Sequence, residues 1–143
     1  MITYCKWFKP SSNRFRRQFY TKYLHHPRDI ICVAHLRMGC HKLDIERRRW
    51  GSRRVDRSQR KCACCGLGIV EDEMHFMLEC PVYDGIRRHL LLKLEMDGVV
   101  SDANMKSICC GNSEAQWHAI ARFIKTGFYM RAAKVAEIGR AHV

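Results

Sequence analysis

The feature that most constrains this chain is a cluster of cysteines with one histidine near its middle. Residues 62–80 read Cys-Ala-Cys-Cys-Gly-Leu-Gly-Ile-Val-Glu-Asp-Glu-Met-His-Phe-Met-Leu-Glu-Cys, which contains the spacing Cys62-x2-Cys65-x9-His75-x4-Cys80. Two residues between thiolates allow a tight turn to aim both sulfurs at one point, and Gly66 frees the backbone for that turn. Three cysteines and one histidine complete a tetrahedral set, so the spacing predicts one structural Zn2+ site without an open position.

The second half of this pattern needs a break in local structure. The acidic run 71–73 suits the first turn of a short helix, where the helix dipole favours acids, and His75 then lies inside that helix. On an ideal helix Cys80 lies about 140° around the axis from His75, too far for both to reach one ion. Because Cys80 precedes Pro81, helical backbone is disfavoured at Cys80. We therefore expect the helix to distort or end there, so that the Cys80 sulfur turns toward the metal.

Other interpretations of the cysteines remain open. Cys64 competes with Cys65 as a ligand, although Cys62-x-Cys64 is the poorer chelate spacing. Buried thiols around a core histidine, or a redox Cys-x-x-Cys motif, are further alternatives. Nine cysteines are an odd number, so they cannot all pair as disulfides within one chain. A structural zinc ion contributes roughly 10–16 kcal/mol in finger peptides, comparable with a small domain's whole stability, so we expect its removal to unfold at least residues 62–96.

The charge of the chain is concentrated in its first half. The net charge is +12, and residues 1–61 hold 17 Lys/Arg against 4 Asp/Glu. The densest stretch, residues 47–61, has eight basic residues and one acid, and we call it the basic loop. Such density beside an aromatic residue predicts contact with the phosphates of RNA or DNA, and the alternative is a solvated, solubilising loop. The candidate nucleic-acid-binding residues are Arg47, Arg48, Arg49, Trp50, Arg53, Arg54, Arg57, Arg60 and Lys61.

Membrane insertion and secretion are not indicated by the sequence. No segment approaches the roughly 18 consecutive apolar residues of a transmembrane helix, and the N-terminus lacks the apolar core of a signal peptide. Cysteines in such a chain are more often thiols or metal ligands in a reducing compartment. We expect an intracellular location, in the nucleus or cytoplasm, and no membrane partner.

Hydrophobic periodicity predicts a mainly α fold: a small helical domain with an irregular CCHC zinc-knuckle insertion and a long C-terminal helix. A first helix over 11–24 presents Phe15, Phe19 and Tyr23 every four residues and ends before Pro27. A second runs from Ile30 to Met38, capped by Asp29 and stopped by Gly39. Residues 43–50 continue helically and 51–61 form a loop. Later helices begin at Pro81, at Asp102 and after a capping box of Ser113 and Gln116; the one from Pro81 ends at Asp97-Gly98. The final helix buries Trp117, Ile120, Ala121, Ile124, Phe128, Ala132 and Val135.

These elements divide the chain into four parts. Residues 1–61 form a basic helical segment with the arginine-rich loop, 62–96 the CCHC module with its following helix, and 97–136 a C-terminal helical segment. One back-translation of residues 137–143 resembles, from its second base on, a common sequencing-library adapter read in frame. We therefore interpret them as an artefact and expect the natural sequence to diverge after Ala136, with coincidence as the alternative.

Two runs resemble a known family. The run from Leu36 to Glu46, followed by Arg49-Trp50 and Arg60, resembles the region just after the polymerase in non-LTR retrotransposon reverse transcriptases. The run from Val70 to Tyr83, with Arg87, resembles that family's zinc-binding signature, and the final helix with Arg131 resembles its C-terminal helix less specifically. The resemblance covers roughly residues 30–88 and implies metal roles for Cys62, Cys65, His75 and Cys80. Arg48 departs from the pattern, because such sequences tend to have glycine there.

The resemblance implies a module behind a polymerase that helps to grip template RNA or target DNA. The chain has no Tyr/Phe-x-Asp-Asp polymerase motif and no acidic nuclease cluster, so we expect a non-catalytic fragment of a longer RNA-directed DNA polymerase, with the upstream polymerase domain as a partner. The alternative is a structural zinc module that braces the polymerase or mediates protein contacts without touching nucleic acid. A thiol oxidoreductase built on Cys62 and Cys65 and a decayed, non-functional copy are the remaining hypotheses.

Overall fold

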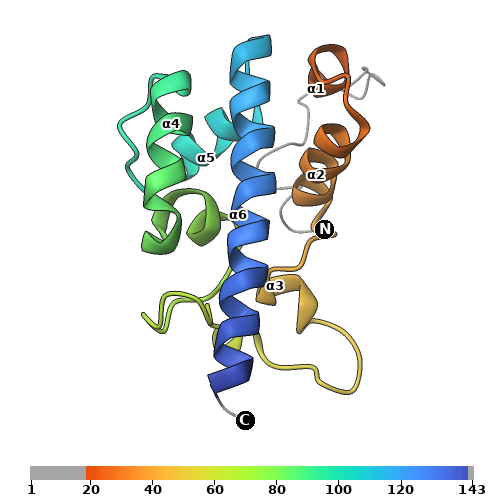
Figure 1. Cartoon of the computed structure of the whole chain (residues 1–143), viewed down its shortest axis with the longest axis vertical. Coiled ribbons are helices and arrows are strands. Elements are labelled where there is room, and N and C mark those ends of the chain that lie inside the picture. Colours follow the sequence, from red (N-terminus) through yellow and green to blue (C-terminus); the bar gives the residue numbers. More distant parts are fainter. Residues whose placement is uncertain (1–18, 142–143) are drawn as a thin grey trace.

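The computed structural model describes residues 19–141 and is mainly helical, as predicted (Figure 1). Within this range the only β-type pairing is one isolated antiparallel bridge between Lys61 and Val70. The helices are α1 (Phe19–Tyr23), α2 (Pro27–Met38), α3 (Asp44–Arg47), α4 (Asp84–Leu94), α5 (Asp102–Cys109) and α6 (Glu114–Ala141), with the 3-10 helices η2 (Arg57–Gln59) and η4 (Pro81–Tyr83) and the π-helical turn η3 (His75–Glu79).

The long helix α6 is the axis of the fold. It runs the height of the molecule between α2 on one side and α4 on the other (Figure 1). Trp117, Ile120 and Ile124 of α6 are almost fully buried, together with Val33 of α2 and Leu90 of α4. Burial of large apolar side chains at this interface supplies the main driving force for folding of this half. No helix among residues 19–141 is both long enough and apolar enough to cross a bilayer.

The capping of α2 differs from the sequence prediction. The helix begins at Pro27 and not at Ile30, because proline suits the first helical position, where no N–H partner is needed. His26 is the N-cap, its ring Nδ1 accepting the N–H of Arg28 at 3.2 Å, so the prediction of an Asp29 cap is wrong. The predicted stop is confirmed, since Gly39 has φ 68° and its N–H bonds back to the last turn.

The first predicted helix is described only in part. Its C-terminal end is α1, whereas its start and Phe15 lie outside the described residues. Tyr20 and Leu24 are the buried residues of this segment, and Tyr23 packs half-buried against the core. The predicted helical stretch 43–50 is helical only over α3, after which the basic loop begins.

Two of the later helices agree more closely with the predictions. Helix α5 has the predicted bounds, and Ser101 caps it by accepting the N–H of Asn104 at 3.1 Å. At the start of α6, Ser113 Oγ accepts the N–H of Gln116 at 3.3 Å, while the Gln116 side chain accepts the N–H of Asn112. The predicted capping box is therefore present with one difference: the Gln116 side chain accepts the N–H of the residue before the N-cap and not that of Ser113 itself.

Two predictions for the C-terminal half are wrong, one of a helix end and one of burial. Helix α4 ends at Leu94, where Glu95 takes the left-handed conformation, and not at Asp97-Gly98. Gly98 has φ 78° in the irregular segment that follows and lies beside Leu91. Ala132 is exposed, contrary to its predicted place in the core stripe of α6. Arg131 is buried beside it, because its guanidinium reaches two buried acids described below.

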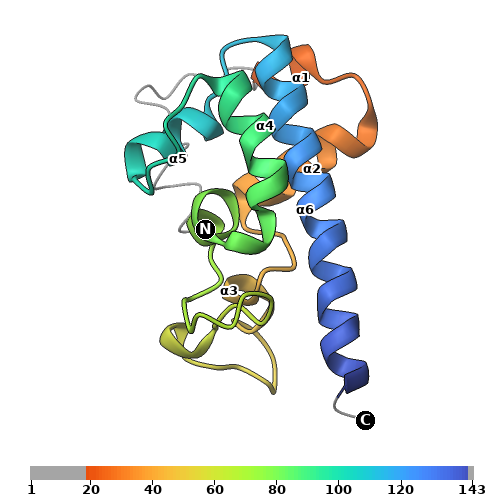
Figure 2. The same cartoon turned by 60° about the vertical axis from the view of Figure 1, so that its left-hand side comes forward.

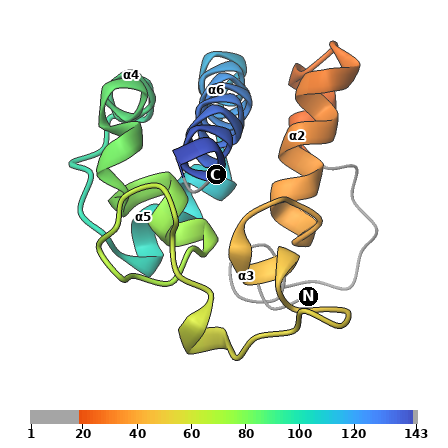
Figure 3. The same ribbon diagram turned by 60° about the horizontal axis from the view of Figure 1, so that its bottom comes forward.

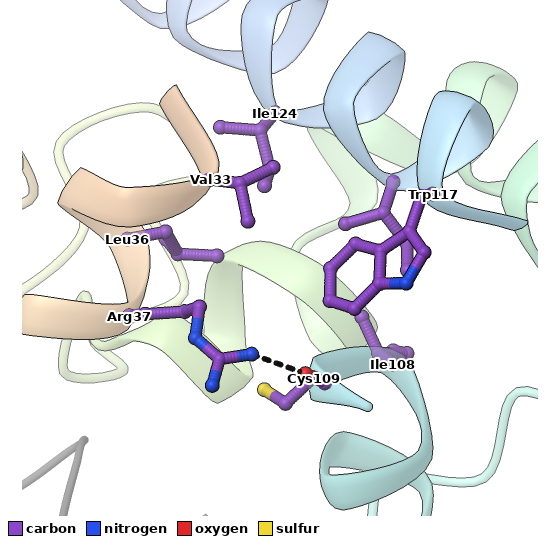
Figure 4. A pocket seen from close by; sticks show the side chains of 8 residues that line it. Val33, Leu36, Arg37, Ile108, Cys109, Trp117 and Ile124 are labelled. Atoms are coloured by element: carbon purple, nitrogen blue, oxygen red, sulfur yellow. Dashed lines mark hydrogen bonds between the residues drawn. The ribbon is translucent and has the colours of Figure 1, made fainter. Parts of the chain in front are cut away.

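A small pocket lies between α2, α5 and α6 (Figure 4). Apolar side chains from the three helices surround it, and the Trp117 indole forms one wall. Arg37 lines it too and donates from Nη1 to the carbonyl of Cys109 at 2.8 Å. This bond ties α2 to the end of α5, so the pocket belongs to the packing of the helical half.

The cysteine segment, residues 62–80, lies next to α3 at one end of the molecule, below the helices in the views of Figures 1 and 2. Figure 3 turns this end toward the reader. Phe76 of η3 joins the two parts, because its buried ring contacts Tyr83, Phe123 and Phe128 with centroid distances of 4.9, 5.4 and 4.8 Å. On α6, Gly127 lies against this ring, where a Cβ would meet it at 2.6 Å. The cysteine segment is thus packed on α6 through an aromatic cluster.

Candidate metal centre

The four predicted ligands converge on one point. The Sγ atoms of Cys62, Cys65 and Cys80 and a ring nitrogen of His75 all lie within 4.8 Å of one another. Three of the four residues are buried, and Cys65 is half-buried. Sulfur and imidazole donors at these separations can hold one metal ion, and the set is compatible with zinc. The predicted spacing is confirmed to this extent.

The first two sulfurs are placed by a short loop with closed ends. The N–H of Cys62 bonds to the carbonyl of Ile69 at 2.8 Å, and Lys61 pairs with Val70 in the isolated bridge. Between these ends, Gly66 and Gly68 have φ values of 68° and 71°. Only glycine takes this left-handed backbone readily, so the two glycines allow the chain to turn with both sulfurs on the inside.

The other two donors are placed by the turn η3. The carboxylate of Asp72 accepts the N–H of His75 at 2.9 Å, so Asp72 caps this turn. The N–H of Cys80 then bonds to the carbonyl of His75 at 2.7 Å, a five-residue step that widens the turn relative to an α-helix. Cys80 is extended, with ψ 120°, immediately before Pro81. The predicted distortion at Cys80 is confirmed, and it takes the form of a π-helical turn.

The ring of His75 is oriented by a residue that the sequence patterns did not reveal. Its Nε2 lies 3.5 Å from Cys65 Sγ, and its Nδ1 lies 3.0 Å from Glu79 Oε2. A carboxylate on the far nitrogen of a ligating histidine fixes the tautomer and the ring orientation. Residues 75 and 79 are one helical turn apart, which is the signal in the sequence that could have indicated this pair.

Cys64 lies beside the centre but with different neighbours. It forms a second close group with Cys62 and Glu71. Both carboxylate oxygens of Glu71 are already engaged, since Arg131 donates Nε to one and Nη2 to the other, each at 2.7 Å. A carboxylate held in this way is a poor metal ligand, so the geometry favours Cys65 over Cys64, in agreement with the spacing argument.

Hydrogen bonds among the donors shift their proton affinities. The pKa of Cys62 is lowered, chiefly by hydrogen bonds from Cys64 and Cys80, and the pKa values of those two thiols are raised by the same bonds and by burial. Burial lowers the pKa of His75, but hydrogen bonds to Cys62 and Glu79 outweigh it and raise the pKa to about 9. Without a metal, the cluster therefore pairs the Cys62 thiolate with a protonated His75 ring, and a bound cation would displace that proton, because only a neutral imidazole coordinates a metal.

Two buried acids beside the centre, Glu71 and Asp44, contact one distant basic residue, Arg131. The Arg131 guanidinium of α6 bonds to Glu71 and lies 3.3 Å from Asp44, and all three residues are at most 5 % exposed. Glu71 also accepts the N–H of Asp44 at 2.7 Å. Pairing of this kind is required because a lone buried charge is strongly disfavoured. The bonds connect α6, α3 and the cysteine segment through one polar cluster, which we call the Arg131 brace.

Two further buried residues hold the same segment. His41 Nε2 lies 2.9 Å from Glu73 Oε1. Arg87 of α4 donates to the carbonyls of Met77 at 2.9 Å and Cys80 at 2.7 Å, and it also pairs with Asp84. These carbonyls stand at the end of η3, where a helical turn leaves acceptors unsatisfied. Arg87 thus supports the backbone that carries Cys80.

The basic loop leads directly into the metal centre, but its cations are not equivalent. Arg60 is half-buried and donates to the carbonyls of Val55 and Ile45, both at 2.9 Å. Four other arginines form ion pairs: Arg47 and Arg48 with the buried Asp44, Arg49 with Glu46, and Arg57 with Asp72. Within residues 19–141, Arg53, Arg54 and Lys61 are exposed and lack an ion-pair partner. The loop therefore carries three cations that are fully available to a ligand.

Comparison of the chain with protein-family models, with curated proteins and with solved structures finds no match.

Proposed function

We propose that this chain is a zinc-stabilised module that binds nucleic acid through the basic loop and performs no catalysis of its own. The observation that carries the proposal is the position of the loop. It begins at α3 and ends at Cys62, so both of its ends are held by the metal centre and the Arg131 brace. A zinc ion at Cys62, Cys65, His75 and Cys80 would hold the loop in one conformation, which lowers the entropy lost on binding.

The choice of zinc follows from the donor set. Three thiolates and one imidazole are the ligands of closed structural zinc sites, and their four donors leave no position for a substrate. His75 has the outer-shell carboxylate that such sites use, in Glu79. The carboxylates of Glu71 and Glu73 are held by Arg131 and His41 and do not compete for the ion.

Phosphate binding follows from the charge of the loop. Arg53, Arg54 and Lys61 present cations to solvent, and Arg60 shapes the loop between them through its two carbonyl contacts. The ion pair of Arg57 with Asp72 is largely exposed and therefore weak, so Arg57 can exchange its acid for a phosphate at little cost. Arg47 and Arg48 instead pair with the buried Asp44. The expected ligand is RNA or DNA, recognised with little sequence preference.

We further propose that the chain is the C-terminal part of a non-LTR retrotransposon reverse transcriptase. The basis is the resemblance of residues 30–88 and the geometry of the metal ligands that it named. The buried Arg87 and Arg131, both part of the resemblance, contribute to the support of the centre. In such a protein the module would help an upstream RNA-directed DNA polymerase to grip template RNA or target DNA.

A second function has its own support. Five arginines of the loop already have partners within the chain, Arg60 on carbonyls and four others on acids. This arrangement suits a structural module that braces a polymerase or binds a protein without touching nucleic acid. The two functions differ in the role of Arg53, Arg54 and Lys61, which bind phosphate in the first and do not touch nucleic acid in the second.

Fluorescence anisotropy with labelled RNA and DNA oligonucleotides, measured at 50 and 200 mM salt, distinguishes the nucleic-acid-binding module from the structural module. If Arg53, Arg54 and Lys61 contact three phosphates, affinity falls about 40-fold between the two salt concentrations, and six contacts give about 10³-fold. Changing these three residues to glutamine is expected to remove most of the binding. The matched control changes three exposed cations elsewhere, Arg88, Lys93 and Arg122, to glutamine. Equal binding by both triple variants would favour the structural module.

A further inference from the structure

The most exposed tryptophan of the described chain lies in the basic loop. Trp50 is 70 % exposed, whereas Trp117 in the core is 1 % exposed. An indole exposed to water does not gain the favourable free energy of burial, and such exposure is typical of a binding surface. Trp50 lies three residues after the end of α3 and precedes Gly51, whose φ of 83° is left-handed backbone that glycine takes readily.

The ring of Trp50 is supported on one face by a cation. The Arg49 guanidinium lies over it at 4.9 Å from the ring centroid, and Arg49 is itself paired with Glu46 at 3.4 Å. This contact orients the indole without burying it. Since Arg49 covers one face and most of the residue is exposed, the opposite face is open to a planar ligand.

Free cations share the same short loop. The N–H of Val55 bonds to the carbonyl of Arg48 at 3.1 Å, which closes residues 48–55 into one loop. Within it, the N–H of Arg54 bonds to the carbonyl of Gly51 at 3.2 Å, so Arg53 and Arg54 stand in the turn that follows Trp50. Residues 48–55 contain no acid. An open aromatic face thus lies next to cations that can bind the phosphates of the same strand.

We infer that Trp50 stacks on an unpaired base and that the basic loop therefore prefers single-stranded to double-stranded nucleic acid. The inference rests on the proposed function and adds the strand class of its ligand. In a duplex each base is covered on both faces by its neighbours, so only the phosphates remain for the loop. In a single strand one base can leave its neighbours and lie on the indole, while the adjoining phosphates reach Arg53 and Arg54.

The test uses the full, zinc-loaded chain and its Trp50→Ala variant. The probes are labelled uridine and deoxythymidine single strands of about 12 nucleotides, within the size range of known single-strand sites, and long duplexes of RNA and of DNA. Loss of one stacked base is expected to weaken single-strand binding about tenfold, equivalent to about 1.4 kcal/mol, and to change duplex binding less than about twofold. Trp50→Phe keeps an aromatic face and should restore most of the affinity. The RNA and DNA arms show which backbone is preferred.

The matched control is Tyr129→Ala, which removes an aromatic residue on α6 that is 78 % exposed. It should leave binding to every probe unchanged. Equal losses for single strands and duplexes in Trp50→Ala, or no loss for either, would overturn the inference while the proposed function stands. Absence of binding by the unaltered chain to all probes at 50 mM salt would instead overturn the proposed function. Intact α-helical circular dichroism of Trp50→Ala excludes misfolding as the cause of a loss.

Discussion

The two halves of this molecule are held together by different forces. In the helical half, α2, α4, α5 and α6 bury tryptophan, isoleucine and leucine side chains around one apolar core. In the cysteine segment Phe76, Met77 and Leu78 pack into the core of the helical half, and the other buried groups are thiols, carboxylates, an imidazole and the guanidinium of Arg131. Regular structure there is limited to single turns. Apolar packing loses stability gradually as atoms are removed, whereas a polar cluster depends on every partner being present. The same chain should therefore respond very differently to changes in its two halves.

Removal of the metal is the largest expected perturbation. A structural zinc ion contributes roughly 10–16 kcal/mol to the folding of a finger peptide, and the cysteine segment has no apolar core of its own to replace it. Addition of a chelator is expected to unfold the cysteine segment first, while the apolar contacts of α2 and α4 with α6 persist. Hydrogen exchange read by mass spectrometry tests this region by region. Unchanged protection of residues 62–80 in chelator would contradict the metal assignment.

Loss of the Arg131 brace is the next largest effect. Replacement of Arg131 by methionine, which has a similar length, leaves Glu71 buried without its cation, whereas Asp44 keeps its ion pairs with Arg47 and Arg48. Breaking a buried ion pair from one side lowers the free energy of unfolding by about 3–5 kcal/mol. Chemical denaturation of the zinc-loaded chain measures this loss. The control Arg122→Met, at an exposed position of the same helix, is expected to change stability by less than about 0.5 kcal/mol.

The difference between the halves also decides what could be predicted from the sequence. The convergence of the four candidate ligands was predicted because a chelate spacing is local, and the break at Cys80 followed from the next residue, Pro81. Helices α5 and α6 were found from their capping residues and periodicity. The Arg131 brace was missed because its partners are 60 and 87 residues away, and no local pattern joins them. One signal was present: Arg131 interrupts the apolar stripe of α6, three residues after Phe128.

The acidic run 71–73 is a second case in which a local sequence pattern did not reveal long-range contacts. Acids in a row suggest a helix N-terminus, and Asp72 does cap the turn η3. Glu71 and Glu73, however, are buried and bonded to Arg131 and His41. Local propensity described the role of one acid, whereas the tertiary structure determined the roles of the other two.

A smaller effect is expected when the metal donors stay in place and only their support changes. Glu79→Gln keeps the size of the side chain but removes the carboxylate that holds His75 Nδ1. Loss of such an outer partner weakens metal binding by about 10–100-fold. Competition with a chromophoric chelator measures the change. The control Glu114→Gln alters an exposed acid of α6, paired weakly with His118, and should leave the metal affinity unaltered.

The smallest expected effect lies where the two halves meet. Gly127 is in the middle of α6, and alanine at an exposed helical position would raise stability by about 1 kcal/mol through helix propensity alone. At Gly127 the added methyl group would meet the Phe76 ring at 2.6 Å, and this ring packs the metal turn onto the helix. Overpacking of a buried site costs about 1–3 kcal/mol, so a net loss of about 1 kcal/mol is expected for Gly127→Ala. Gly85→Ala on α4 meets no atom within 4 Å and should follow propensity with a small gain. Opposite signs for these two substitutions in thermal denaturation would show that the metal turn sits tightly on α6. An increase in stability for both variants would mean that the Phe76 ring can move away from α6 without loss of stability.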